Sequence, residues 1–223
     1  MSTANLFLNG EWKSAKAGGT REIINPANNQ VLATVADAAE ADAQVAIAAA
    51  REAFDNGLWP RLRAAERASY LFKLADAIDA RAEEFAVLET RNNGKPLREA
   101  KFDVADAASC FRYYAGLITK PQGQTFEVPD PNITTMVVRE PMGVCAQIIP
   151  WNYPLLMAAW KLAPGLAAGN CCILKPAEAT PLTAIKLFEL IAQVGFPPGS
   201  AQLLLGPGPT VGHALAASPL VDK

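Results

Sequence analysis

The chain has 223 residues, of which 51% are hydrophobic, 19% charged and 8% aromatic, a balance typical of a globular protein and unlike that of a disordered one. Its 20 Lys and Arg side chains are offset by 22 Asp and Glu, so the formal charge of -2 gives no electrostatic basis for binding a nucleic acid. The length is sufficient for one large domain with a sizeable core.

The spacing of the cysteines and the length of the apolar runs indicate whether a metal site or a membrane segment is expected. The four cysteines lack a C-x-x-C pair and the chain has a single histidine, so no metal site is expected. The first five residues lack the basic start of a leader, and no apolar run reaches the roughly 18 residues of a membrane-spanning helix. We expect a reduced, cytoplasmic protein that binds neither a membrane nor a nucleic acid.

The amino-terminal part is predicted to be helical after a short strand pair around residues 6–8 and 22–24. Asp37, with Glu40 three residues later, has the form of a capping box that starts a helix. The apolar residues of that helix are Val45, Ala49 and Phe54. Apolar residues then recur at three-and-four spacing until Asn92-Asn93-Gly94 supplies a left-handed stop. These residues are Leu71, Leu74, Ile78, Phe85 and Leu88. Another helix is predicted from about residue 97 to 118.

The composition changes near Lys120, because residues 1–120 contain 31 of the 42 charges and residues 121–223 contain 14 of the 17 prolines. A β-branched run at 134–139 has strand character, and an alternation of short apolar strands and amphipathic helices follows. The strands are predicted at 144–149, 171–174 and 201–204, and the helices at 154–167, 181–194 and 209–217. This order indicates βαβ units and a parallel sheet. The chain ends where a fourth strand is due.

Ligands of open α/β sheets bind at the carboxyl ends of the strands, so the residues after each strand are the candidates for a site. Pro150-Trp151-Asn152-Tyr153-Pro154 follows the first of these strands. The Asn152 amide could donate a hydrogen bond to a developing oxyanion. It could instead cap the next helix, which the spacing alone favours.

Lys175-Pro176-Ala177-Glu178 follows the second strand. Glu178 could accept hydrogen bonds from ribose hydroxyls and repel a 2′-phosphate, while Lys175 donates to the same sugar. Taken alone, these four residues favour a solvated pair of little energetic value.

The third strand leads into a loop with glycines at positions 206, 208 and 212. Their spacing departs from G-x-G-x-x-G, and Pro207 and Pro209 remove two amide donors. The loop therefore indicates a close approach of backbone to a cofactor and not a tight pyrophosphate clamp.

Tyr153, Met157 and Trp160 fall on one face of the helix after the first strand. Such a stripe usually packs in a core. Lys161 lies in the same, otherwise apolar helix, so it either reaches solvent or serves a polar site.

Four of these motifs together, in order and spacing, resemble the aldehyde dehydrogenase superfamily. They are Ile148-Ile149-Pro150-Trp151-Asn152-Tyr153-Pro154, Trp160-Lys161, Lys175-Pro176-Ala177-Glu178 and Gly206-Pro207-Gly208-Pro209-Thr210. Asn25-Pro26-Ala27 and Asn93-Gly94-Lys95-Pro96 fit as well. The resemblance covers essentially the whole chain and is greatest with the betaine aldehyde and aminoaldehyde branch. It implies an α/β fold with an incomplete Rossmann-like parallel sheet and an amino-terminal helical segment.

The resemblance also implies a chemistry and a set of roles. Members oxidise an aldehyde through a Cys thiohemiacetal, pass hydride to NAD(P)+, and hydrolyse the thioester with a Glu general base. The implied catalytic residues are Asn152 in the oxyanion hole and Lys161 in a proton or charge relay. The implied coenzyme-binding residues are Ile148, Ile149, Pro150, Trp151, Lys175, Glu178 and Gly208. The implied lining of the aldehyde tunnel is Tyr153, Met157 and Trp160, whose rings could attract an ammonium group.

By the same resemblance, the nucleophilic Cys, the general-base Glu and a Phe-Thr-Gly-Ser segment have no counterpart in the chain. We therefore expect the amino-terminal portion of an NAD-dependent enzyme, inactive alone. Residues 1–120 would hold the strand pair and helices, 121–140 part of an oligomerisation arm, and 141–223 the βαβαβα coenzyme-binding core, truncated before its fourth strand.

Glu178 favours NAD over NADP, although NADP remains possible, and the arm implies a homodimer or homotetramer. Some members bind a monovalent cation with a carboxylate at the position where this chain has the amide of Asn92. The alternative to an enzyme is a non-catalytic nucleotide-binding or interaction protein on the same scaffold.

Overall fold

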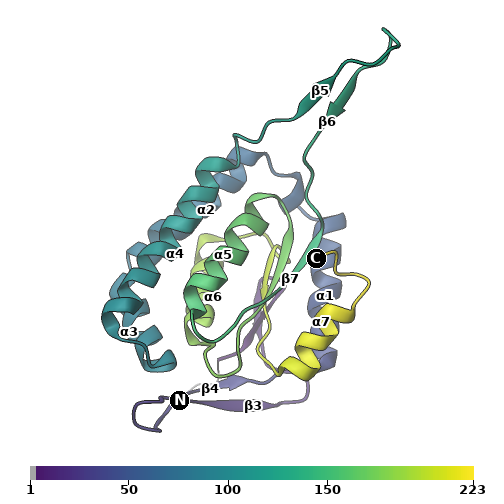
Figure 1. Ribbon diagram of the computed structural model, residues 1–223. Coiled ribbons are helices and arrows are strands. Elements are labelled where there is room, and N and C mark those ends of the chain that lie inside the picture. The colour runs from purple at the N-terminus through teal and green to yellow at the C-terminus, as the bar shows by residue number, and fades with distance from the viewer. Residues whose placement is uncertain (1–3) are drawn as a thin grey trace.

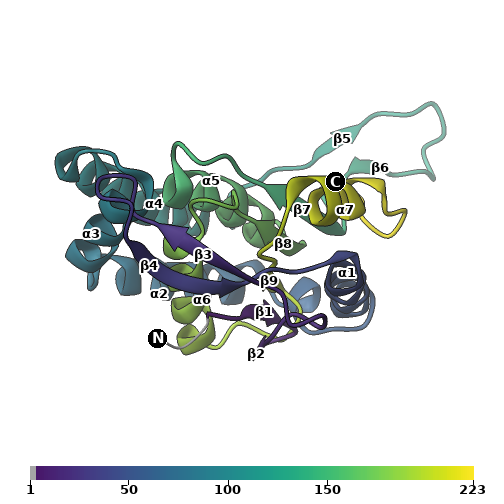
Figure 2. The same cartoon turned by 90° about the horizontal axis from the view of Figure 1, so that it is seen from below.

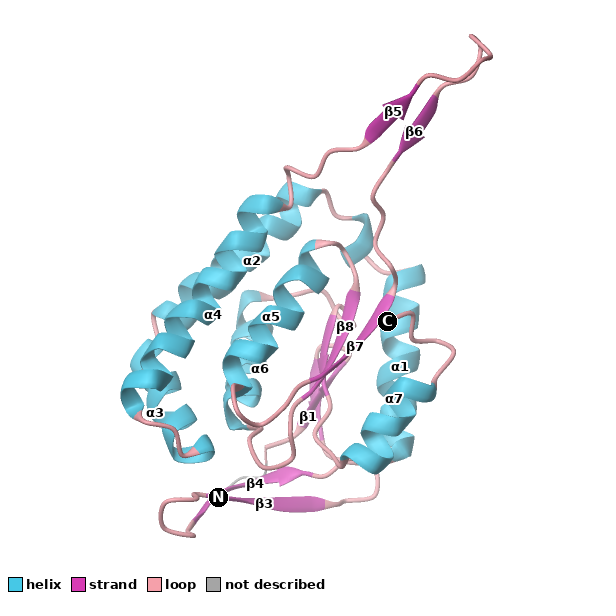
Figure 3. Cartoon of the chain, in the orientation of Figure 1, coloured by secondary structure: helices cyan, strands magenta, loops and turns pink. Residues whose placement is uncertain are grey.

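The computed structural model describes residues 4–223, and its main sheet has five strands in the order β2-β1-β9-β8-β7. The sheet runs through the middle of the molecule, between helices (Figures 1 and 3). The strands are β1 (Leu6–Leu8), β2 (Glu11–Lys13), β7 (Val144–Ile148), β8 (Cys171–Lys175) and β9 (Ala201–Leu203). The last three strands are parallel, which confirms the predicted parallel sheet. Residues 1–3, part of the segment used above to argue against a leader, lie outside the described residues.

Helices cover both faces of this sheet (Figure 1). They are α1 (Glu40–Asp55), α2 (Ala64–Asp79), α3 (Ala82–Asn93), α4 (Leu97–Leu117), α5 (Pro154–Ala167), α6 (Leu182–Val194) and α7 (His213–Ala217), with a 3-10 turn at Trp59–Arg61. α1 and α7 lie on one face, and α5 and α6 lie on the other, where α2, α3 and α4 form an outer layer. Every residue of β8 is buried, as expected for a parallel strand covered on both sides. None of the helices within residues 4–223 is long and apolar enough to span a membrane.

The predicted amino-terminal strand pair is wrong in its partners. β1 pairs with β2 and with β9, whereas residues 22–24 belong to β3 (Thr20–Ile24), which pairs with β4 (Val31–Ala36). All three residues of β1 are buried, which suits a place in the central sheet, while β3 buries only Ile23. The β3–β4 hairpin passes across the end of the sheet at which β7, β8 and β9 finish (Figures 1 and 2).

The predicted capping box at the start of α1 is also wrong. Asp37 pairs with Arg21 at 2.9 Å, and the carboxylate of Asp42 accepts a hydrogen bond from the backbone N–H of Ala39 at 3.0 Å. Val45, Ala49 and Phe54, expected on the apolar face, are half-buried. The buried face is made by Ala43, Ala46, Ile47, Ala50 and Ala53. Small side chains allow α1 to approach the sheet closely.

One predicted helix begins irregularly, and the segment before β7 forms a separate hairpin. Residues 208–212 form a π turn before α7, because the N–H groups of Val211 and Gly212 both bond to the carbonyl of Pro207. Residues 121–140 form a hairpin of β5 (Gln124–Phe126) and β6 (Thr135–Val137), which projects away from the body (Figure 1). The stop at the end of α3 is confirmed, since Gly94 has a φ of 88°.

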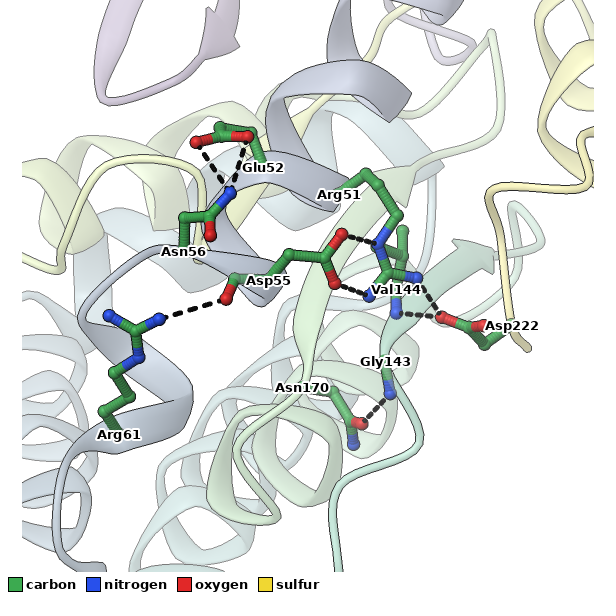
Figure 4. Close-up of polar contacts among 9 residues, drawn as sticks. All are labelled: Arg51, Glu52, Asp55, Asn56, Arg61, Gly143, Val144, Asn170 and Asp222. Atoms are coloured by element: carbon green, nitrogen blue, oxygen red, sulfur yellow. Dashed lines mark hydrogen bonds and ion pairs between the residues drawn. The ribbon is translucent and has the colours of Figure 1, made fainter.

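A polar network holds the amino end of β7 (Figure 4). Asp222 Oδ2 accepts hydrogen bonds from the backbone N–H of Val144 and from Arg51, both at 2.8 Å. Arg51 also pairs with Asp55 at 2.7 Å. The backbone N–H of Asp222 donates to the carbonyl of Val144 at 2.9 Å. The last residues of the sequence, where the next strand is due, thus run along the outer edge of β7.

Replacing Arg51→Ala leaves Asp222 without its cation and is expected to lower the free energy of unfolding by about 1 kcal/mol. Urea denaturation followed by circular dichroism measures the change. Arg63→Ala is the control, because within residues 4–223 the Arg63 side chain forms only an exposed pair with Glu66, and its loss should leave the free energy of unfolding unchanged. Equal effects of the two substitutions would contradict a special role for Arg51.

Candidate functional site

The carboxyl ends of β7 and β8 lie side by side. Ile148 is the register partner of Lys175, and the N–H of Ile149 donates to the carbonyl of Lys175 at 3.0 Å. Ile149 is buried, whereas Ile148 and Pro150 are exposed. The loops that leave these two strands therefore start together, at the carboxyl end of the parallel strands.

Asn152 does not cap α5, so the capping interpretation is wrong. The residue that precedes the helix is Tyr153, and no side chain caps it there. Instead, the buried carboxylate of Glu89 accepts a hydrogen bond from the N–H of Leu155 in the first turn, at 3.4 Å. Asn152 is exposed, and within residues 4–223 its side-chain amide makes no hydrogen bond. The amide is thus free to donate to a ligand.

Lys175 and Glu178 are not a solvated pair. Glu178 Oε1 accepts a hydrogen bond from the backbone N–H of Gly208 at 2.6 Å, which joins the loop after β8 to the loop after β9. Lys175 is buried, and its ammonium donates to the carbonyl of Pro176 at 3.0 Å. Burial lowers the pKa of Lys175, and the nearby carboxylate of Glu178 opposes that change. Both side chains are therefore held in place.

The third loop reaches the same end of the sheet. A Cβ atom added to Gly212 would lie 3.7 Å from Ile148 Cδ1 and 3.8 Å from Lys175 Cδ. The N–H of Gly208 is already bound to Glu178, and the N–H groups of Val211 and Gly212 bond to the carbonyl of Pro207. These amides do not form an open cradle for phosphate, in line with the absence of a pyrophosphate clamp expected from the prolines.

Tyr153, which precedes α5, and Met157 and Trp160 on α5 do not form a simple core stripe. Tyr153 is 47% exposed and Trp160 is 54% exposed, while Met157 is half-buried. Lys161 is exposed, so its stem reaches solvent. A depression of about 360 Å³ lies between α4 and α5. It is lined by Cys110, Tyr114 and Trp160.

The four cysteines lie away from the carboxyl ends of the strands. Burial raises the pKa of Cys110 to about 11 and that of Cys171 to about 12, so both thiols stay protonated at neutral pH. Cys145 and Cys172 are register partners across β7 and β8, and Cys172 Sγ accepts a hydrogen bond from the Gln147 amide at 3.3 Å. All three strand thiols are buried. None has the setting of an exposed nucleophile.

The end of α3 holds both loops, a role that no pattern in the sequence indicated. The Asn92 amide donates to the carbonyl of Ala179 at 2.8 Å and accepts from the N–H of Leu182, the first residue of α6, at 3.1 Å. The Asn93 amide donates to the carbonyl of Trp151 at 2.6 Å. The sequence indicates Asn92 and Asn93 as a helix stop and as positions of the family resemblance, and nothing local predicts that they bind these two loops. In residues 4–223, no group of three or more His, Cys, Asp or Glu side chains could hold a metal ion.

A buried charge cluster of Glu89, Lys95 and Asp103 was also missed. The Lys95 ammonium lies 3.7 Å from Glu89 and bonds to Asp103. Glu89 also accepts a hydrogen bond from the Thr183 hydroxyl at 2.6 Å. Burial raises the pKa of Glu89, and Thr183 and Lys95 counteract that effect. A visible clue was that Glu89 follows Phe85 by four residues, on the buried face of its helix.

Comparisons with known proteins agree with this arrangement. The aldehyde dehydrogenase family matches residues 12–223. Betaine aldehyde dehydrogenase of Bacillus subtilis is 51% identical over 217 residues, which cover 97% of this chain and 44% of that protein. Human retinal dehydrogenase 2 is 44% identical over 98% of this chain and 42% of its own length.

A crystal structure of betaine aldehyde dehydrogenase from Staphylococcus aureus in complex with NAD+ superimposes with a TM-score of 0.96 at 43% identity. The superposition covers 99% of this chain and 44% of that one. The chain thus spans less than half the length of the relatives it matches. Its fold and sequence show that it belongs to the aldehyde dehydrogenase family.

Proposed function

We propose that the chain supplies the coenzyme-binding core and the oxyanion donor of an NAD-dependent aldehyde dehydrogenase, which oxidises an aldehyde to a carboxylic acid. The observation that carries this proposal is the meeting of three strand-end loops at one end of the sheet. They lie beside Asn152, whose side chain does not cap a helix. The family match and the NAD+ complex of the Staphylococcus relative support it.

The coenzyme would lie along the ends of β7 and β8. Lys175 and Glu178 would bind the hydroxyls of the adenosine ribose, and Gly208 would pack near the adenine. The lining of the nicotinamide side would come from Ile148, Ile149, Pro150 and Trp151. NAD+ supplies the hydride acceptor when bound.

Asn152 would donate its amide N–H to the oxygen that becomes negative when a thiolate adds to the aldehyde. Lys161 lies on α5, nine residues after Asn152 in the chain. It would take part in moving a proton or balancing charge. We place the thiolate and the general base outside these 223 residues, because the cysteines here are buried or half-buried. The chain alone would then be inactive, and it would act in the cytoplasm as part of a longer polypeptide.

For the substrate, we propose betaine aldehyde or an aminoaldehyde. The exposed rings of Tyr153 and Trp160, with Met157 between them on α5, would line the aldehyde path and attract an ammonium group by cation–π contact. The name of the Bacillus relative agrees with this substrate class. Rates with betaine aldehyde, an aminoaldehyde and a simple aliphatic aldehyde test it, and a preference for the aliphatic one would contradict it.

A non-catalytic nucleotide-binding protein is the second candidate, favoured by the unreactive setting of the cysteines. The coding sequence separates the two. A reading frame that continues past Lys223 into a Phe-Thr-Gly-Ser segment and a Gly-Gln-x-Cys stretch supports the enzyme. A stop codon at that point supports the binding protein.

In the full-length protein, NAD+ should bind at least about tenfold more tightly than NADP+, because the Glu178 carboxylate opposes a 2′-phosphate. Glu178→Gln keeps an oxygen for the Gly208 N–H but removes the charge, so it should reduce the preference. Calorimetric titration measures both affinities. Glu189→Gln, on the exposed side of α6, is the control. Equal affinity of the unmodified protein for both coenzymes would contradict the assignment.

Asn152→Ala in the full-length enzyme should lower kcat by about 10²–10³ while coenzyme affinity is kept, because the oxyanion loses a preorganised donor. Steady-state kinetics with a saturating aldehyde measure the effect. Asn56→Ala is the control, since within residues 4–223 the Asn56 side-chain amide bonds only to Glu52, at the surface. An unchanged kcat would show that Asn152 does not stabilise the oxyanion.

We also propose that the β5–β6 hairpin is an arm that pairs subunits into a homodimer or homotetramer. Its apolar side chains are exposed, and a groove of about 620 Å³ lies at its base, between the ends of α4 and α5. The exposed apolar residues are Phe126, Ile133, Met136, Val137 and Val138. Exposed apolar groups gathered on one projection are typical of an interface.

Met136→Asp should dissociate the oligomer, because it would bury a charge in the subunit contact. Light scattering coupled to size exclusion measures the mass. Leu58→Asp is the matched control, since Leu58 is 58% exposed and Met136 60% exposed, but Leu58 lies far from the arm in the sequence. A mass unchanged by Met136→Asp would argue against pairing through this hairpin.

A further inference from the structure

The charge cluster of Glu89, Lys95 and Asp103 has no part in the coenzyme site described above. Glu89 is 1% exposed and Asp103 7% exposed, and the side chain of Lys95 is 10% exposed. Burying three charges is costly, and apolar residues of similar volume are often as stabilising or more so. Stability alone therefore does not explain why these three charges are buried together. The contacts of the cluster suggest another role.

Lys95 contacts the start of α5. Its ammonium lies 4.4 Å from the centroid of the Tyr153 ring. A cation over the face of an aromatic ring is attracted to it, and more strongly where water is excluded. Tyr153 directly follows Asn152, so a contact that holds the Tyr153 ring also restricts the backbone that carries the Asn152 amide.

Two residues of α3, Glu89 and Asn93, restrict the backbone on either side of Asn152. Glu89 accepts from the N–H of Leu155 at 3.4 Å, in the first turn of α5. The amide of Asn93 binds the carbonyl of Trp151 at 2.6 Å. Asn152 thus lies in a segment held at Trp151, at Tyr153 and at Leu155, although its own side chain is bound by nothing within residues 4–223.

The same carboxylate links this segment to the coenzyme side. Glu89 Oε2 accepts from the Thr183 hydroxyl in the first turn of α6, which follows the loop of Lys175 and Glu178. The end of α3 thereby sets the start of α5 relative to the start of α6. Asp103, on α4, completes the contacts of the Lys95 ammonium and keeps it between two carboxylates.

We propose that Lys95 is a positioning residue: held by Glu89 and Asp103, its ammonium fixes the Tyr153 ring and so aims the Asn152 amide at the reacting oxygen. This inference rests on the proposed function, since the aim of Asn152 matters only for aldehyde oxidation. Small errors of position at a reacting centre are costly to rate, and a positioning residue acts on turnover more than on coenzyme binding.

Lys95→Met in the full-length protein tests the inference, because methionine keeps much of the apolar stem and loses the charge. We expect kcat to fall about 10- to 100-fold and KM for NAD+ to stay within about twofold. Lys101→Met is the matched control, because Lys101 pairs with Glu83 at the surface, and it should keep the kcat of the unmodified protein. A kcat unchanged by Lys95→Met would overturn the inference, as would an equal loss in both variants.

A second measurement needs no activity. Hydrogen–deuterium exchange of residues 151–157 should speed up in Lys95→Met and stay unchanged in Lys101→Met, because only the first variant releases the Tyr153 ring. If Lys95→Met does not fold, Tyr153→Leu takes its place and should show the same faster exchange. Unchanged exchange in a folded variant overturns the inference. A protein that shows this exchange pattern but oxidises no aldehyde would refute the proposed function and leave the positioning of Asn152 standing.

Discussion

The structure depends on the parallel pairing of β7, β8 and β9, which brings three loops to one end of a sheet. Parallel strands end at the same edge, so Ile148 and Lys175 become neighbours although they are far apart in the chain. The next polar contact, from the Gly208 N–H to Glu178, ties the second loop to the third. The position of every candidate residue follows from this pairing, because none lies more than a short loop or helix from a strand end.

A second layer, outside the sheet, sets the direction in which the loops leave it. The end of α3 places Glu89 and Asn92 where they bind the starts of α5 and α6, and those contacts are buried. Helix starts carry unbonded N–H groups and a partial positive charge, so a carboxylate or amide oxygen is a suitable partner. One helix end thus controls both loops, and Asn152 does not have to serve as a cap.

The sequence predicted well what local periodicity decides. The alternation of short apolar strands and amphipathic helices after residue 143 placed β7 to β9, α5 and α6, and Gly94 ended α3 where expected. Predictions that depended on distant partners were less successful. The pairing of β1 with β9 joins residues almost 200 positions apart, and nothing in the sequence of Leu6–Leu8 indicates that β9 is the partner.

The site shows the same division. The strand-end rule selected Asn152, Lys175 and Glu178, but spacing alone favoured a cap and a solvated pair, and both of those interpretations were wrong. The cap of α5 comes from Glu89, 66 residues earlier, and Glu178 is fixed by an N–H 30 residues later. Local sequence indicates which residues are candidates, whereas the tertiary contacts decide which of them are free to bind a ligand.

The central claim is that these three loops bind a nicotinamide coenzyme next to the Asn152 amide. A crystal structure of the full-length protein grown with NAD+ tests it most directly. The account predicts ribose hydroxyls within hydrogen-bonding distance of Lys175 and Glu178, with the nicotinamide on the Asn152 side of β7. Coenzyme bound away from the ends of β7 and β8 would contradict it.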